Sequence, residues 1–125
     1  MIVRDFGPAA IAALKRVDLA TLSERPSDSS GSFEFNGCTC GLAGFVGSPP
    51  WELHSDGDEL IHVLAGWTRL RVREDGEELV RTLRAGDLAV VPKGCWHRND
   101  APDGVTLFHM TPSVGNRNSW DDPAR

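Results

Sequence analysis

The sequence predicts an all-β fold, a sandwich or barrel of short strands preceded by a short helix. From Ser32 onward, strand-like runs of alternating or buried character follow one another, separated by turn residues at short intervals. The dipeptide Asp75-Gly76 is a strong signal for a two-residue hairpin turn. A length of 125 residues is that of a single domain with a core of its own.

The first third of the chain is the least regular. Proline in the first turn, several alanines and a basic end predict a short helix over Pro8–Arg16. The polar stretch Ser23–Ser32 contains proline and glycine, which is typical of a loop. We therefore expect residues 1–32 to form a helix and loop that pack on the barrel, residues 33–112 to form the barrel, and residues 113–125 to form a C-terminal tail.

Alternation with a period of two predicts the strands. The clearest case is Trp67–Arg73, where Thr68, Leu70 and Val72 share one face and the arginines share the other. The expected strands are Phe33–Phe35, Cys38–Val46, Trp51–His54, Glu59–Leu64, Trp67–Arg73, Glu77–Leu83, Leu88–Val91, Cys95–Arg98 and Val105–Thr111. The tail is polar, and we expect it either to pack across a barrel face or to remain loose.

Composition and charge exclude several classes of function. A formal charge of -5 and the lack of a basic run argue against a nucleic-acid-binding surface. The apolar stretch Pro8–Leu14 is too short to span a bilayer and lacks the order of a secretory signal, so we expect a cytoplasmic protein without membrane contact. The thiols of Cys38, Cys40 and Cys95 form no C-x-x-C pair, and we expect them to be reduced.

Two histidines and two carboxylates lie beside turn residues in two separate segments. On an extended strand Glu52 and His54 point to the same face, because side chains alternate along the strand. A short turn then brings Glu59 back beside them, and His97 must come from another strand. Two imidazoles and one carboxylate on a rigid β framework suit a redox-capable or Lewis-acid divalent ion.

The same two segments resemble the paired signature motifs of the cupin superfamily. The first family motif, G-x5-H-x-H-x3,4-E-x6-G, is met at His54, Glu59 and Gly66. The second, G-x5-P-x-G-x2-H-x3-N, is met at Gly86, Pro92, Gly94 and His97. The chain departs from the pattern at two positions: Glu52 stands where the family has its first histidine, and the terminal asparagine is absent, although Asn99 lies nearby. The resemblance covers about residues 38 to 112 and implies a small single-domain jelly-roll barrel, a double-stranded β-helix.

The resemblance also implies a metal centre. One divalent ion (Fe, Mn, Ni or Zn) would be held by His54, Glu59 and His97. For Glu52 three roles stay open: a fourth metal ligand, a general base beside a three-ligand ion, or an exposed charge. A carboxylate at this position favours harder or intermediate ions over copper(I).

The family's known chemistries set the expected function. They include dioxygenase, isomerase, decarboxylase and lyase reactions, and the fold alone does not choose among them. We expect an enzyme that acts on a small polar metabolite at a mononuclear metal; the alternative is a non-catalytic cupin that binds a small molecule or a metal. Small cupins resemble one another in pairing through a sheet face, and Trp67, Arg69 and Arg71 offer such a face for a homodimer.

Other polar side chains are expected outside the ligand set. Cys95 shares strand parity with His97, but we expect it to be a small buried hydrophobe. The side chain of His62 falls on the outer face of its strand, whereas the face of His109 is ambiguous. The two aspartates in the turn before Glu59 are expected to be solvated.

Overall fold

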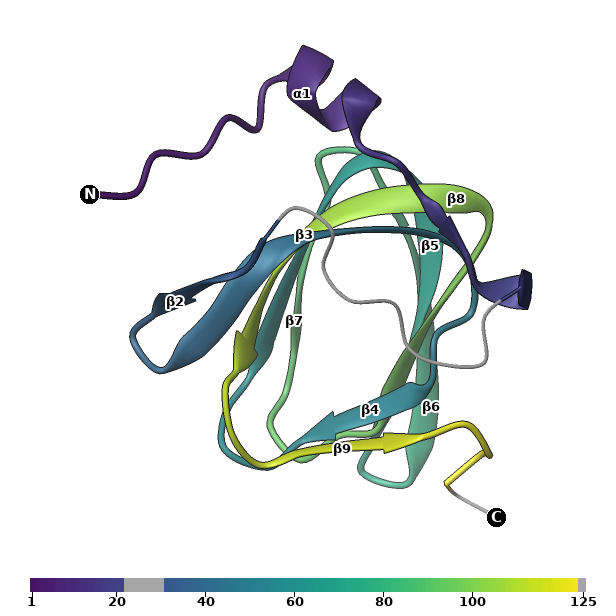
Figure 1. Ribbon diagram of the computed structural model, residues 1–125. Helices are drawn as coiled ribbons and strands as arrows, with labels where there is room; N and C mark the ends of the chain where they lie inside the picture. Colours follow the sequence, from purple (N-terminus) through teal and green to yellow (C-terminus); the bar gives the residue numbers. More distant parts are fainter. Residues whose placement is uncertain (22–30, 124–125) are drawn as a thin grey trace.

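The computed structural model describes residues 1–21 and 31–123, and they form a mostly β structure with one short α-helix (Figure 1). The helix α1, Pro8–Ala13, starts at the predicted proline but ends before the predicted Arg16. It ends early because Leu14 adopts an extended backbone with φ -71° and ψ 123°. No helix within the described ranges is both long enough and apolar enough to cross a membrane.

The chain after α1 runs along the barrel. Strand β1, Val17–Asp18, pairs in parallel with the end of β3, and a 3₁₀ turn, Leu19–Thr21, follows. The side chain of Arg16 holds this segment to the barrel, because its Nε donates a hydrogen bond to Thr106 Oγ1 at 3.2 Å. The predicted loop at Ser23–Ser32 lies mostly outside the described residues.

Every region predicted as a strand contains one. The remaining strands are β2 (Phe33–Phe35), β3 (Cys38–Gly47), β4 (Trp51–His54), β5 (Glu59–Glu74), β6 (Glu77–Arg84), β7 (Leu88–Val91), β8 (His97–Pro112) and β9 (Asn116–Ser119). Two pairs of predicted strands are single long strands in the structure. These are β5 and β8, which each cover two of the predicted runs.

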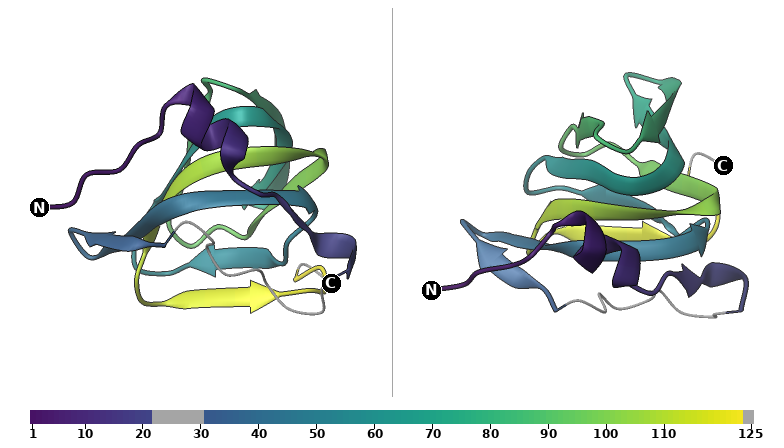
Figure 2. Two further views of the ribbon diagram at one scale, coloured as in Figure 1. Left: turned by 45° about the horizontal axis from the view of Figure 1, so that its top comes forward. Right: turned by 90° about the horizontal axis from the view of Figure 1, so that it is seen from above.

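The two long strands belong to both layers of the barrel (Figure 2). In one layer the strand order is β1, β3, β8, β5, β7. Strand β2 pairs with the same edge of β3 as β1 does, but at the start of β3, whereas β1 pairs near its end. In the second layer the order is β9, β4, β8, β5, β6. This arrangement confirms the predicted jelly-roll barrel.

The bend of β5 explains why the sequence suggested two strands. The pairing with β8 shifts register between Val63 and Ala65 and again between Gly66 and Arg69. At the bend Gly66 has φ 75°, and a Cβ atom there would overlap the carbonyl oxygen of Gly104. Only glycine fits this position, because it tolerates positive φ and has no side chain to collide with the neighbouring strand.

The hydrophobic core fills the barrel between the two layers. Its buried members come from β3, β5, β6, β7, β8 and the 3₁₀ turn: Leu19, Phe45, Ile61, Val63, Leu70, Leu83, Val91, Ala101, Val105 and Leu107. Strand alternation places Ile61 and Val63 on the same face of β5 as Glu59. Glu59, at the start of β5, therefore lies at one end of the apolar interior.

The C-terminal segment is part of the barrel. Residues Asn116–Ser119 form β9, which pairs antiparallel with β4 along its full length. Beyond it, the Asp122 carboxylate makes a two-pronged ion pair with the guanidinium of Arg73, which also stacks over the ring of Trp51 at 4.1 Å. The polar tail of the sequence thus forms an edge strand.

Candidate metal centre

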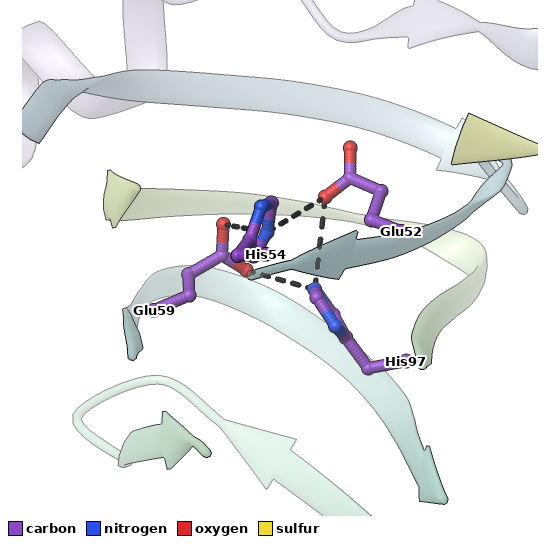
Figure 3. A group of neighbouring side chains, drawn as sticks. All are labelled: Glu52, His54, Glu59 and His97. Atoms are coloured by element: carbon purple, nitrogen blue, oxygen red, sulfur yellow. Dashed lines mark hydrogen bonds and ion pairs between the residues drawn. The ribbon is translucent and has the colours of Figure 1, made fainter. Parts of the chain in front are cut away.

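Four buried side chains meet at one end of the barrel (Figure 3). Glu52 and His54 come from β4, Glu59 from the start of β5 and His97 from the start of β8. Each offers one ligand atom, and these atoms all lie within 4.8 Å of one another. The structure therefore brings together all four side chains that the sequence singled out.

Local geometry accounts for the convergence. On β4, Glu52 and His54 are two residues apart and share a face, and Glu52 lies directly opposite His97 in the register of β4 and β8. The turn of the second motif is hydrogen-bonded to the first: the Lys93 N–H donates to Asp58 Oδ1 and the Gly94 N–H donates to His54 O, both at 2.8 Å. The two motifs thus hold each other in place.

Distances within the group are short. His97 Nε2 lies 3.1 Å from Glu59 Oε1 and 3.6 Å from Glu52 Oε2. His54 Nε2 lies 3.3 Å from Glu59 Oε2 and 3.7 Å from Glu52 Oε2. Each carboxylate therefore faces both imidazoles, and Glu59 approaches them more closely than Glu52 does.

Partners outside the group orient each of the two rings. His97 Nδ1 lies 3.2 Å from the carbonyl oxygen of Cys95, and His54 Nδ1 lies 2.7 Å from Asn116 Oδ1. Both partners are acceptors, so each Nδ1 carries the hydrogen and each Nε2 faces the centre. This is the usual arrangement around histidines that bind a metal through Nε2.

The carboxylate of Glu59 also has a partner outside the group. The Thr111 hydroxyl donates to Glu59 Oε2 at 2.5 Å, and Thr111 Oγ1 lies 2.9 Å from His109 Nδ1. Because the single hydroxyl hydrogen goes to the carboxylate, the hydrogen between Thr111 and His109 must come from the ring. A directed chain therefore runs from His109 through Thr111 to Glu59.

The electrostatics favour ionised groups in this buried cluster. Burial alone would raise the pKa of Glu59, but the imidazoles of His54 and His97 outweigh it and hold that pKa well below its usual value. Burial alone would lower the pKa of His97, but Glu52 and Glu59 raise it from 6.5 to about 10. In the absence of an ion, a proton on His97 thus compensates the buried negative charge.

The four side chains fit a divalent ion. His54 Nε2 is buried and has no hydrogen-bond partner among the described residues, although two carboxylates face it. A buried nitrogen without a hydrogen bond is costly unless something binds it. Two imidazole nitrogens and two carboxylates form a mixed N and O donor set that suits Fe, Mn, Ni or Zn. The buried 2-His-2-Glu cluster therefore indicates a metal site.

Other candidate residues lie outside the cluster. Cys95 packs against the core and is not among the four residues whose ligand atoms converge. Burial, followed by nearby acidic groups, raises the pKa of its thiol. His62 is half-buried and pairs in register with Phe108, away from the four ligand atoms. His109, whose face was ambiguous, lies opposite Ile61 in the register of β5 and β8, on the interior face.

The sequence did not predict Thr111 and Asn116 as partners of the cluster. Both belong to the stretch that leads out of the second motif, at the end of β8 and the start of β9. Neither lies at a fixed spacing from a histidine that would mark it, so only the strand register of the folded chain shows the contacts.

Comparison with known proteins agrees with this architecture. A family model described as Cupin domain (Cupin_2) matches residues 45–109, more than half of the chain. Ribosomal oxygenase 1 from rat and human is 42% identical over 48 residues, which is 38% of this chain. The matched stretch spans only 8% of each oxygenase.

Several solved structures have the same fold. A cupin-2 domain containing protein from Shewanella frigidimarina NCIMB 400 is 29% identical, with a TM-score of 0.52 over 64% of this chain and 74% of that one. Protein NMB1881 from Neisseria meningitidis is 23% identical, with a TM-score of 0.63 over 90% of this chain and 100% of that one. Oxalate decarboxylase from Bacillus subtilis, a protein with Mn(II) centres, is 14% identical, with a TM-score of 0.55 over 70% of this chain and 29% of that one.

Proposed function

Because this chain belongs to the cupin family, we propose that it is a metal-dependent enzyme acting on a small polar metabolite. One divalent ion would be held by Glu52, His54, Glu59 and His97. The observation that carries the proposal is the buried Nε2 of His54, which makes no hydrogen bond among the described residues and faces two carboxylates. An ion bound here would supply Lewis-acid or, if it is redox-active, electron-transfer chemistry to a bound substrate.

The residues of the chain would bind the ion and hold each other in position around it. Glu59 is held by Thr111 and approaches both imidazoles, so it acts as a fixed ligand. Glu52 Oε2 lies at nearly equal distances, 3.6 and 3.7 Å, from His97 Nε2 and His54 Nε2. This central position favours Glu52 as a fourth ligand. The competing assignment is a general base, and the variant Glu52→Gln distinguishes the two roles.

Polar groups beside the cluster support a polar substrate. Because His109 Nδ1 donates to Thr111, His109 Nε2 is the ring atom that can accept a hydrogen bond from a ligand. The ring is half-buried and lies on the interior face of β8. A metabolite that binds the ion through a carboxylate and offers a hydroxyl or N–H group to His109 would match this arrangement.

The names of similar proteins are consistent with metal-dependent enzyme activity. Oxalate decarboxylase has Mn(II) centres, and ribosomal oxygenase 1 is named for an oxygenase activity. The first similarity is one of fold, and the second covers a small part of the oxygenase, so both support a class of chemistry rather than a reaction.

Metal analysis of untagged protein tests the proposal. We expect about one divalent ion per chain, and we expect replacement of both His54 and His97 by Ala to remove it. Full metal occupancy in the double variant would contradict the site. The change Glu52→Gln should weaken metal retention if Glu52 is a ligand, whereas retained metal with reduced turnover would assign it as a base. A wild-type protein that binds metal but turns over no small carboxylate would support the non-catalytic alternative.

A further inference from the structure

Strand β9 lies directly beside the strand that carries two of the proposed ligands. In the register of the two strands Asn116 is opposite His54 and Asn118 is opposite Glu52. Residues opposite each other in an antiparallel pair have their side chains on the same face. The C-terminal strand therefore places two asparagines on the face of the sheet that carries Glu52 and His54.

The contact between Asn116 and His54 has a defined direction. Asn116 Nδ2 donates to the carbonyl oxygen of Pro112 at 2.8 Å, which fixes the orientation of the amide. The reverse orientation would bring two oxygens together at Pro112, so Oδ1 is the atom that lies 2.7 Å from His54 Nδ1. An amide oxygen only accepts, and His54 Nδ1 must therefore carry the hydrogen.

From this geometry we propose that Asn116 is a positioning residue of the metal centre. It fixes the tautomer and the ring orientation of His54, so that the lone pair of Nε2 is directed at the ion. The inference rests on the proposed metal site and extends it beyond the two sequence motifs, because Asn116 lies after both of them. A chain that lacked residues 116–119 would keep all four proposed ligands and lose this support.

The backbone of this region is held independently of the Asn116 side chain. The Ser55 N–H and hydroxyl both donate to Gly115 O, at 3.1 and 2.9 Å. A Cβ on Gly115, which has φ 78°, would come within 2.5 Å of Ser55 Oγ and Asp56 Oδ1, so the two turns pack closely. These backbone contacts hold the strand when the Asn116 side chain is changed, and the change removes its bonds to His54 and to Pro112 O.

Three variants separate positioning from a general effect on the strand. Asn116→Ala removes the acceptor, and Asn116→Asp retains one. Arg117→Ala is the matched control, because the Arg117 side chain lies over the Trp96 ring at 5.4 Å, on the other face of the same strand. Thermal unfolding of each variant verifies that it is folded before metal binding is compared.

The first measurement is the Kd for Zn²⁺ alone, by competition with a chelator. We expect Asn116→Ala to weaken binding by about 10- to 100-fold, the usual effect of removing the partner of a histidine ligand. Asn116→Asp should recover part of the affinity, because it keeps an acceptor for His54 Nδ1 but loses the donor to Pro112 O. Arg117→Ala should bind like the wild type. Wild-type affinity in a folded Asn116→Ala variant would overturn the proposal, as would an Arg117→Ala variant that loses as much affinity as Asn116→Ala.

The second measurement reads the tautomer without any metal. Nitrogen NMR of the His54 ring should show the hydrogen on Nδ1 in the wild type and a shift toward the other tautomer in Asn116→Ala. An unchanged tautomer would overturn the proposal. If the wild type binds no Zn²⁺ while the tautomer shifts as expected, the proposed metal site fails but the positioning of His54 by Asn116 stands.

Discussion

Raising the pH should tighten metal binding at this site, because His97 must lose a proton before its Nε2 can hold an ion. In the metal-free protein that proton is shared with Glu59 Oε1 at 3.1 Å and faces Glu52 Oε2 at 3.6 Å. Burial alone would lower the pKa of His97, and the two carboxylates raise it to about 10. A proton and a metal ion therefore compete for the same nitrogen.

The magnitude follows from the pKa. Below about 10, His97 of the metal-free site is protonated, so binding an ion releases one proton from it. The apparent Kd should then fall about tenfold for each unit of pH, or about 1.4 kcal/mol. Between about pH 6.5 and 8.5 the affinity should rise roughly 100-fold, and the increase should end as the pH passes the pKa of His97. An unperturbed histidine would give almost no change above pH 7.5, since its pKa is about 6.5.

Isothermal titration calorimetry with Ni²⁺ measures both parts of this prediction. Repeating the titration in two buffers that differ in protonation enthalpy gives the number of protons released. The variant His62→Asn is the matched control, because this histidine lies outside the cluster and its loss should leave the pH dependence unchanged. A Kd that is independent of pH above about 7, with no buffer-dependent heat, would refute the proton competition at His97.

Two further substitutions test the contacts around the centre. Thr111→Val removes the hydroxyl that donates to Glu59. It should lower the free energy of unfolding, measured in urea, by about 1.5–3 kcal/mol, the usual value for a hydrogen bond to a charged group. An unchanged urea midpoint would show that Glu59 needs no such partner. Gly66→Ala should cost roughly 2–4 kcal/mol, because the new methyl group would overlap Gly104 O at positive φ. Gly76→Ala is its control, since Gly76 has a similar φ of 78° with open space around it, and equal losses in the two variants would contradict the steric argument.

Much of the metal centre could be predicted from the sequence because its determinants are local. The parity of Glu52 and His54 follows from two-residue alternation on one strand, and the spacing of Glu59 from His54 follows from one short turn. The position of His97 required the paired motifs, since no local pattern relates it to β4. In the structure it lies directly opposite Glu52.

The features that sequence patterns missed depend on long-range register. Two strands, Glu59–Leu64 and Trp67–Arg73, were predicted, yet β5 continues through Gly66 because β8 pairs with it on both sides of the bend. The helix was predicted to reach Arg16, but it ends at Ala13 and the backbone is extended at Leu14. The Arg16 side chain instead bonds Thr106 on the distant strand β8, a contact that no local pattern indicates. The role of Asn116 depends on which residue of β4 it faces, and a polar tail carries no signal for that choice.

The shared strands β5 and β8 also have a consequence for how the chain folds. The proposed ligands Glu59 and His97 are 38 residues apart, and His54 is 62 residues from Asn116. Contacts this distant in sequence close late and place such a fold among the slow, millisecond-to-second folders. The complete centre forms only when both layers have closed, so an ion that prefers the native site acts mainly after the rate-limiting step. A bound ion should therefore prolong the lifetime of the native state by slowing unfolding, while leaving the rate of folding nearly unchanged.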